Sequence, residues 1–195
     1  MIIGITGSIG SGKTTAAKIF SKYHYTRIDA DEIGHELLKS NKKIKNKLIT
    51  YFGNEIIGKN GNIDRKKLGG IVFNDKNELK KLNSIMHPLI INEIKNKIKK
   101  IQKECGDDAK IIIDAPLLIE IGADKLVDKV VVLKAFHENV IARNKRFSME
   151  QLEKISMTQM PLAEKLKKAD FMIDNTKDLK HVKKQVEEIV NRLNQ

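Results

Sequence analysis

The sequence predicts an α/β protein with a central parallel sheet of about five strands and helices on both of its faces. Two observations support this class. Short runs of β-branched residues alternate with helical patterns along the chain, which is typical of parallel strands joined by crossover helices. A glycine-rich turn, GITGSIGSGKTT at 4–15, joins the first such run to the first helix. The chain of 195 residues is long enough for one core with a small inserted subdomain.

The first half of the chain is expected to form a strand, a helix, a second strand and then a long helical region. Residues 1–6 predict a buried strand, and helical spacing of apolar residues follows from about Lys13 to about Tyr23. TRIDAD, 26–31, predicts a strand with carboxylates at its end. Beyond it the sequence predicts helix over 32–51, a glycine-rich loop over 52–68, and helix over 75–104 that is kinked or restarted at His87-Pro88.

The second half of the chain returns to strands. KIIIDAPLL, 110–118, and DKVVVLKA, 128–135, are apolar runs of the kind that forms buried parallel strands. The remaining pattern predicts two helical stretches, a short strand and a last helix, at 137–146, 149–169, 170–175 and 178–193.

One domain is expected, with a helical insertion. The stretch between the second and third predicted strands is too long for a plain crossover. We therefore expect about 32–105 to form a helical subdomain over the carboxyl edge of the sheet, with 1–31 and 106–195 as the core.

The charge balance is strongly basic. Lys and Arg number 37 against 25 Asp and Glu, a formal net charge of +12. Such an excess favours anionic partners such as nucleotides or nucleic acid, or it simply solvates helix faces. Because the lysines are spread along the chain and aromatics make up only 5%, we expect no specific nucleic-acid partner. Nonspecific, salt-dependent binding to nucleic acid remains a secondary alternative.

A few features of the sequence limit the possible cellular location and metal content of the protein. No apolar run approaches the ~20 residues that span a bilayer, so no membrane association is expected. Cys105 is the single cysteine, which excludes an intramolecular disulfide and fits a cytoplasmic location. The five histidines are scattered without cysteine partners, which argues against a structural zinc site.

The clearest functional motif is Gly7-Ser8-Ile9-Gly10-Ser11-Gly12-Lys13-Thr14, which fits G-x-x-x-x-G-K-[ST] at every fixed position. Its glycines let the backbone approach phosphate oxygens, and successive N–H groups from Gly10 to Thr15 then point into one concavity. Lys13 supplies a cation for the β- and γ-phosphates of ATP, and the Thr14 hydroxyl is a Mg²⁺ ligand. The motif predicts a P-loop NTPase three-layer fold.

Asp29 and Asp31 follow the second predicted strand, where alternation would place both carboxylates on one side. A kinase that acts on a hydroxyl needs a carboxylate there to accept or orient the proton. The alternative is that Asp31 caps the helix that follows.

Two further sets of residues also allow two interpretations each. Asp114 ends the run IIID, where a Walker B aspartate would hold Mg²⁺ directly or through water, or where it would cap the strand end. Arg143 and Arg146 share one side of a predicted helix. They either close over the phosphates or are solvated.

In combination these motifs resemble the dephospho-CoA kinase family over nearly the whole chain. The resemblance rests on the following segments, which occur in family order: GITGSIGSGKTT, IDADEIGHEL, FGNEIIGKNGNIDRKKLGGIVFND, IMHPLI, DAPLLIE, TQMP and KADFMIDN. The glycine loop is common to many kinases, whereas the other blocks together are specific.

The resemblance implies a P-loop kinase core, a helical acceptor subdomain over about 32–105 and a lid over about 143–160. It implies ATP and Mg²⁺ as cofactors, and dephospho-CoA as a small-molecule substrate whose ribose 3′-hydroxyl is phosphorylated. Asp31 would be the base with Asp29 beside it, Arg143 and Arg146 would be lid arginines, and Asn175 would lie near adenine. The expected acceptor site comprises Asp29, Asp31, His35, Arg65, His87, Asp114, Pro116 and Leu117.

The chain departs from the family pattern at three points, and each keeps the chemical groups that the reaction needs. Position 8 is serine where glycine is usual, which fits if Ser8 keeps a negative φ. The segment 143–148 is short, and Thr176 stands where a glycine often follows IDN. The oligomeric state is expected to be a monomer or a weak homo-oligomer.

Two other interpretations compete with this one, a second enzyme class and a switch that acts by binding partners. The first is a P-loop kinase for a nucleoside or nucleotide, which would share the loop and lid but lack the DAD and DAPLLIE blocks. The second is a GTPase switch, since DEIG at 31–34 spells D-x-x-G. This tetrapeptide follows the loop too closely for a usual switch region, and no N-K-x-D motif for guanine occurs.

Overall fold

A computed structural model describes residues 1–135 and 149–195. This part of the chain divides into two compact units. The first comprises Met1–Asp29 together with Lys95–Gln195, and the second comprises Ala30–Ile94.

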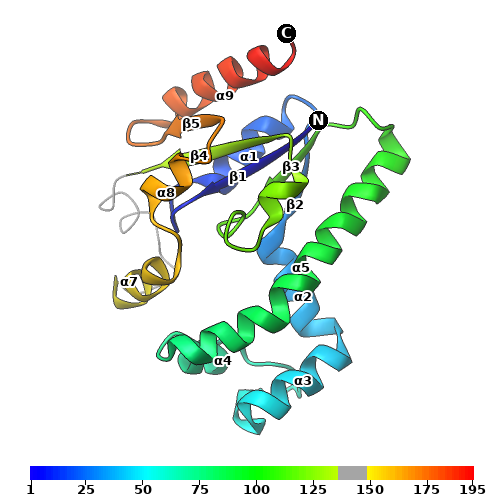
Figure 1. The fold of residues 1–195 in the computed structure, drawn as a ribbon, viewed down its shortest axis with the longest axis vertical. Coiled ribbons are helices and arrows are strands. Elements are labelled where there is room, and N and C mark those ends of the chain that lie inside the picture. The colour runs from blue at the N-terminus through cyan, green and yellow to red at the C-terminus, as the bar shows by residue number, and fades with distance from the viewer. Residues whose placement is uncertain (136–148) are drawn as a thin grey trace. The chain divides into compact units, whose positions relative to one another are not determined.

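The first unit is built on a five-stranded parallel sheet (Figure 1). The strands are β1 (Ile2–Gly7), β2 (Thr26–Asp29), β3 (Ile111–Asp114), β4 (Lys129–Lys134) and β5 (Phe171–Asp174), in the order β2-β3-β1-β4-β5. All four neighbouring pairs are parallel, so the predicted α/β class and strand number are confirmed. The register pairs Asp114 with both Ile5 and Asp29. The carboxyl ends of β2 and β3 therefore lie level, and β1 extends two residues beyond them, to Gly7.

Each face of this sheet is covered by different elements. Ile3 and Ile5 of β1 pack with the buried faces of α1 (Lys13–Ser21) and α9 (Leu179–Leu193) in one apolar core. Thr6 alternates with them and therefore faces the opposite side. On that side lie η2 (Ala123–Leu126) and α8 (Leu162–Leu166), both in contact with β1.

Residues 149–169 form two helices rather than one continuous stretch. Helix α7 (Met149–Thr158) ends before Gln159, and α8 begins after Pro161, which is extended at φ −52° and ψ 143°. Proline has no backbone N–H to donate inside a helix, so it suits a position at the start of a helix. The predicted helix over 137–146 lies outside the described residues.

The second unit is helical. It comprises α2 (Ala30–Ser40), α3 (Lys42–Phe52), η1 (Asn54–Ile56), α4 (Arg65–Val72) and the first part of α5 (Lys76–Cys105). The predicted helix over 32–51 is divided at Asn41, whose side chain accepts a hydrogen bond from Ile44 N at 3.1 Å and caps α3. The apolar core of the unit is formed by Ile44, Leu48, Phe52, Ile56, Ile63, Leu68, Val72, Ile85 and Met86.

Helix α5 continues through Pro88 without a restart, so of the two expected outcomes, a kink or a restart, the restart is wrong. A proline removes one helical hydrogen bond and is unfavourable inside a helix. Here Ile85 and Met86 are buried just before the proline, and Leu89 and Ile90 pack on the same core just after it. The burial of apolar side chains on both sides offsets the lost bond.

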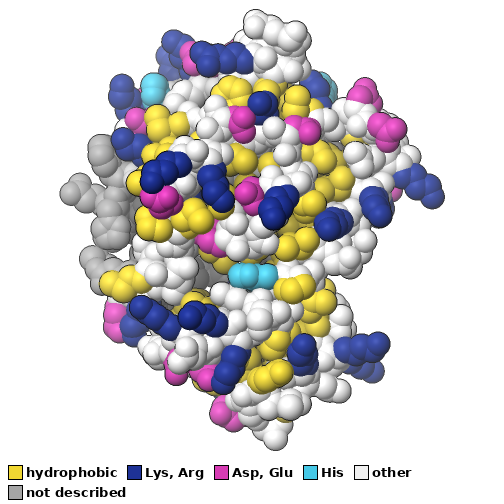
Figure 2. Space-filling model, in the orientation of Figure 1, with side chains coloured by type: hydrophobic (Ala, Val, Ile, Leu, Met, Phe, Trp, Pro, Cys, Tyr) yellow, Lys and Arg dark blue, Asp and Glu magenta, His cyan; other side chains and the backbone are white. Residues whose placement is uncertain are grey.

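Charged side chains are dispersed over the one face of the molecule that Figure 2 shows. On the face drawn in Figure 2, lysine and arginine side chains lie among acidic and apolar ones rather than in one patch. Among the described residues, no helix combines the length and the apolar character needed to cross a bilayer.

Candidate active site

The glycine loop joins β1 to α1 in the conformation that its sequence requires. Gly7, Gly10 and Gly12 have φ values of 147°, 70° and 92°, a region that favours glycine. At Gly12 any β-carbon would collide with the side-chain amide of Asn175. Ser8 does not have a positive φ, since His24 is the described non-glycine residue that does. The serine at position 8 is therefore compatible with the loop.

Lys13 closes the loop on itself. Its Nζ donates to the carbonyl oxygens of Gly7 at 3.2 Å and Ser8 at 2.8 Å, and the residue is only 7% exposed. Helix α1 begins at this lysine and has no side-chain cap on its first turn. The first backbone N–H groups of a helix carry a partial positive charge and suit an anion.

Asp114 lies at the centre of a polar cluster at the end of β3. Its Oδ2 accepts a hydrogen bond from Thr14 Oγ1 at 3.1 Å. The same oxygen accepts from Arg27, with Nε at 3.1 Å and Nη2 at 2.6 Å. Arg27 Nη2 also donates to Asp29 Oδ2 at 2.5 Å. The cluster thus joins the glycine loop to two carboxylates on neighbouring strands.

Arg27 is a residue of this cluster that the sequence pattern did not single out. The available signal was its position two residues before Asp29 on one strand, because residues i and i+2 share a face. Burial alone would lower the pKa of the Arg27 guanidinium, but the hydrogen bond and charge of Asp114, together with those of Asp29, raise it above its ordinary value. Arg27 therefore remains a fixed positive charge in this cluster.

Asp31 does not lie on a strand. Strand β2 ends at Asp29 and α2 begins at Ala30, so the expected alternation of the two carboxylates on one strand is wrong. Asp29 is the last residue of the first segment of the first unit, whereas Asp31 belongs to the second unit, which begins at Ala30.

The predicted acceptor residues of the second unit lie on its helices. His35 is on α2, and His87 is on α5. Arg65 is the first residue of α4, where Asp64 caps the helix by accepting from Lys66 N and Lys67 N.

Pro116 and Asn175 make defined contacts in the first unit, and Leu117 follows Pro116 directly in the chain. The carbonyl of Pro116 accepts a hydrogen bond from Thr6 Oγ1 at 3.0 Å. Asn175 is buried and its Nδ2 donates to the carbonyl of Ser11 at 2.8 Å. Arg143 and Arg146 lie outside the described residues.

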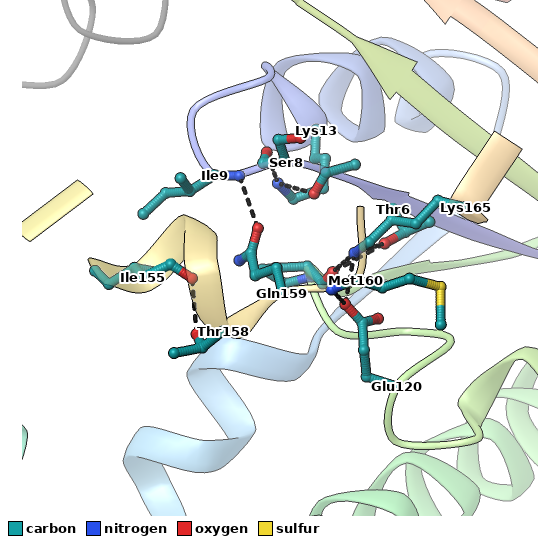
Figure 3. A network of polar contacts seen from close by, with 12 residues as sticks. Thr6, Ser8, Ile9, Lys13, Glu120, Ile155, Thr158, Gln159, Met160 and Lys165 are labelled. Atoms are coloured by element: carbon teal, nitrogen blue, oxygen red, sulfur yellow. Dashed lines mark hydrogen bonds and ion pairs between the residues drawn. The ribbon is translucent and has the colours of Figure 1, made fainter. Parts of the chain in front are cut away.

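A second polar network lies beside the phosphate loop, on the face of β1 toward which Thr6 points (Figure 3). Gln159 Oε1 accepts a hydrogen bond from Ile9 N at 3.1 Å. Lys165 Nζ forms an ion pair with Glu120 Oε1 at 2.9 Å. Gln159 lies in TQMP and Glu120 in DAPLLIE, two of the segments that carry the family resemblance. The sequence alone indicated no role for Gln159, Glu120 or Lys165.

The parallel sheet and the glycine loop, with Lys13 at the start of α1, define a P-loop kinase fold. Such folds serve many acceptors. A model of the dephospho-CoA kinase family matches residues 1–181, and the chain belongs to this family.

Individual relatives agree with the family match. The dephospho-CoA kinase of Fusobacterium nucleatum is 43% identical over 190 residues, which cover 96% of this chain and 95% of the relative. The crystal structure of a Thermus thermophilus protein superposes with a TM-score of 0.79 at 26% identity, covering 99% of this chain and 97% of that one. Dephospho-CoA kinase from Campylobacter jejuni has a TM-score of 0.71 at 29% identity, with 98% and 96% covered.

Proposed function

We propose that this enzyme transfers the γ-phosphoryl group of ATP to the ribose 3′-hydroxyl of dephospho-CoA, giving CoA and ADP, the last step of CoA synthesis. The family match over residues 1–181 supports the choice of acceptor. The hydrogen bond between Thr14 and Asp114, at 3.1 Å, is the observation that carries the chemistry. It brings a hydroxyl of the phosphate loop against a carboxylate at the strand ends.

The loop is proposed to bind the donor. Backbone N–H groups of Gly10, Ser11, Gly12, Lys13, Thr14 and Thr15 would surround the β-phosphate. Lys13 would exchange its bonds to the loop carbonyls for the β- and γ-phosphate oxygens, where charge develops during transfer. Asn175 is assigned to the adenine side, and its contact with Ser11 supports a position directly beside the loop.

Thr14 and Asp114 offer a suitable donor set for Mg²⁺. Both are hard oxygen ligands, and Mg²⁺ commonly takes one or two protein oxygens and completes its shell with phosphates and water. Among the described residues, the hydrogen bonds to Asp114 fall on Oδ2, so Oδ1 is the oxygen proposed to face the metal or its water. When bound, the ion would neutralise phosphate charge. Arg27 already offsets part of the charge of Asp114, which favours contact through water.

Asp31 is proposed as the general base. The ribose 3′-oxygen attacks the γ-phosphorus, the bond to the β–γ bridging oxygen breaks, and the hydroxyl proton passes to the Asp31 carboxylate. Asp29 is the next candidate. Its Oδ2 is held by Arg27, which supports a role for Asp29 in fixing the arginine rather than in taking the proton.

The remaining assignments complete the acceptor site and the lid. His35, Arg65, His87, Pro116 and Leu117 are proposed to contact dephospho-CoA. Arg143 and Arg146, within a lid over about 143–160, are proposed to stabilise the transferred phosphoryl group and to exclude water. A cytoplasmic monomer or weak homo-oligomer fits these roles.

A substrate panel tests the proposal. ADP release is followed with Mg²⁺-ATP and, separately, dephospho-CoA, nucleosides and nucleoside monophosphates. We expect rapid turnover with dephospho-CoA alone among these acceptors. Turnover confined to nucleosides or nucleotides would replace the proposal with a nucleoside or nucleotide kinase.

A further inference from the structure

Lys165 is a charged side chain with no exposed surface, at 0%. Its Nζ donates to the Pro116 carbonyl at 2.5 Å and to Thr6 Oγ1 at 3.4 Å, and it pairs with Glu120 Oε1 at 2.9 Å. Thr6 immediately precedes the first glycine of the phosphate loop. Pro116 lies two residues after Asp114. The ammonium thus joins the start of the loop to the segment that follows β3.

The ion pair between Lys165 and Glu120 is also connected to the phosphate loop through a second set of contacts. Glu120 Oε1 also accepts from Met160 N at 2.9 Å. The residue before it, Gln159, accepts from Ile9 N at 3.1 Å through its side chain. The contacts therefore close a ring that runs from Ile9 through Gln159, Glu120 and Lys165 to Thr6. Figure 3 shows these side chains converging from α8, the segment before it, and the loop after β3.

The stability of the fold alone does not explain why a lysine is buried at position 165. Burying a charge is costly even when it is paired, and apolar replacements of buried ion pairs are often neutral or stabilising. An apolar side chain would fill the same space, but it would make no directional bond to the Pro116 carbonyl or to Thr6. The ring instead fixes atoms on both sides of Gly7 and Ser8, the residues whose carbonyls hold Lys13.

We propose that Lys165 is a positioning residue for phosphoryl transfer, which acts by holding the first half of the phosphate loop in place relative to Asp114. This inference rests on the proposed function. It predicts that loss of the ring lowers kcat while the loop still binds nucleotide, because small misplacement of reacting groups is costly in rate. ADP binding should change little, since the helix N-terminus and the later loop amides are untouched.

The experiment compares Lys165→Met with Lys167→Met. Lys167 is close in sequence, and it is exposed and pairs with Glu164 on the surface. The measured quantities are the Kd for ADP, KM for both substrates, and kcat at a temperature well below the melting point of each variant. We expect Lys167→Met to match the wild type, and Lys165→Met to lose about 10- to 100-fold in kcat with the Kd for ADP within threefold.

A double-mutant cycle separates positioning from a merely structural role. Gln159→Leu removes the contact of the ring with Ile9. If the ring acts as one unit, the fall in kcat of the double variant is smaller than the product of the two single falls. A fall of less than fivefold in Lys165→Met, or single effects that multiply independently, would overturn the inference.

A second variant and a second assay give a result even if Lys165→Met does not fold or dephospho-CoA is not the acceptor. If Lys165→Met yields no folded protein, Gln159→Leu alone decides, with a threefold loss of kcat in support and a smaller loss against. Slow transfer from ATP to water is measured in parallel for all variants and needs no dephospho-CoA. A wild type inactive toward dephospho-CoA would therefore refute the proposed function, while the hydrolysis rates would still decide the role of Lys165.

Discussion

Arg27 donates two hydrogen bonds to one oxygen of Asp114, at 3.1 Å from Nε and 2.6 Å from Nη2. The register explains why this is possible, because Asp29 and Asp114 are partners across β2 and β3 and Arg27 lies two residues before Asp29. One guanidinium thereby balances two carboxylates at the edge that also receives Thr14. The arrangement predicts that Arg27 is needed for both stability and the proposed metal site.

Arg27→Met should destabilise the protein by about 3 kcal/mol, because it leaves Asp114 buried without its charge partner. Chemical denaturation monitored by circular dichroism measures this. The control is Arg192→Met on exposed α9 surface, which should change stability by less than about 0.5 kcal/mol. Equal stability of the two variants would show that the cluster contributes nothing to the fold.

Gly12→Ala should impair both folding and nucleotide binding. The backbone at position 12 has a φ of +92°, and an added β-carbon would strike Asn175, so a loss of about 1–3 kcal/mol is expected. Gly70→Ala is the matched control, because nothing lies within 4 Å of its β-carbon and its helix favours alanine.

Combining Gly12→Ala with Asn175→Ala should recover part of this loss, since the steric clash is removed and the unfavourable φ remains. ADP titration and thermal melting measure the recovery. No recovery in the double variant would mean that the contact with Asn175 does not explain why position 12 is glycine.

Asp170 makes stability depend on pH. Burial raises its pKa, but the hydrogen bond from Val130 N and the contact with Lys129 outweigh this and lower it below the ordinary 3.8. A lowered folded-state pKa gives stability that is present above the unfolded pKa and lost as pH falls through the folded one. The stability gap between wild type and Asp170→Asn should be constant near neutral pH and shrink below pH ~4. A gap that widens with acid would contradict this.

Asp31→Asn should lower kcat by roughly 10²–10⁴ and leave ATP binding nearly intact, the scale expected when a general base is lost. Steady-state kinetics with an independent ATP titration measure both effects. Lys13→Ala serves as the contrast, because it should weaken phosphate binding and transfer together. Normal turnover by Asp31→Asn would shift the role of base to Asp29.

The strands were predictable because continuous β-branched runs such as IIID and VVVL suit a sheet buried on both faces. The phosphate loop was predictable because its glycines and Lys13 act through local backbone geometry. The break at Asn41 had a local signal, the capping side chain, that helical periodicity concealed. The continuation of α5 through Pro88 had no local signal in the sequence, because it depends on the burial of apolar side chains in the tertiary structure.

The ring around Lys165 could not be predicted from spacing. Glu120, Gln159 and Lys165 come from separate segments, and their contacts with Thr6 and Ile9 depend on how α8 packs on β1. Lysines are normally solvated, so a single sequence gives no reason to select one of many. Arg27 was similarly hidden, because its second partner, Asp114, is reached only through the pairing of β2 with β3.

The identity of the phosphorylated oxygen distinguishes transfer to the ribose 3′-hydroxyl from transfer to another acceptor and from ATP hydrolysis. Purified enzyme is incubated with Mg²⁺-ATP and dephospho-CoA, and the product is analysed by ³¹P NMR with correlation to the ribose protons. We expect one new phosphomonoester coupled to the ribose 3′ proton, formed in equal amount with ADP. A phosphate on the 2′-oxygen, or ADP and inorganic phosphate without a new ester, would contradict it.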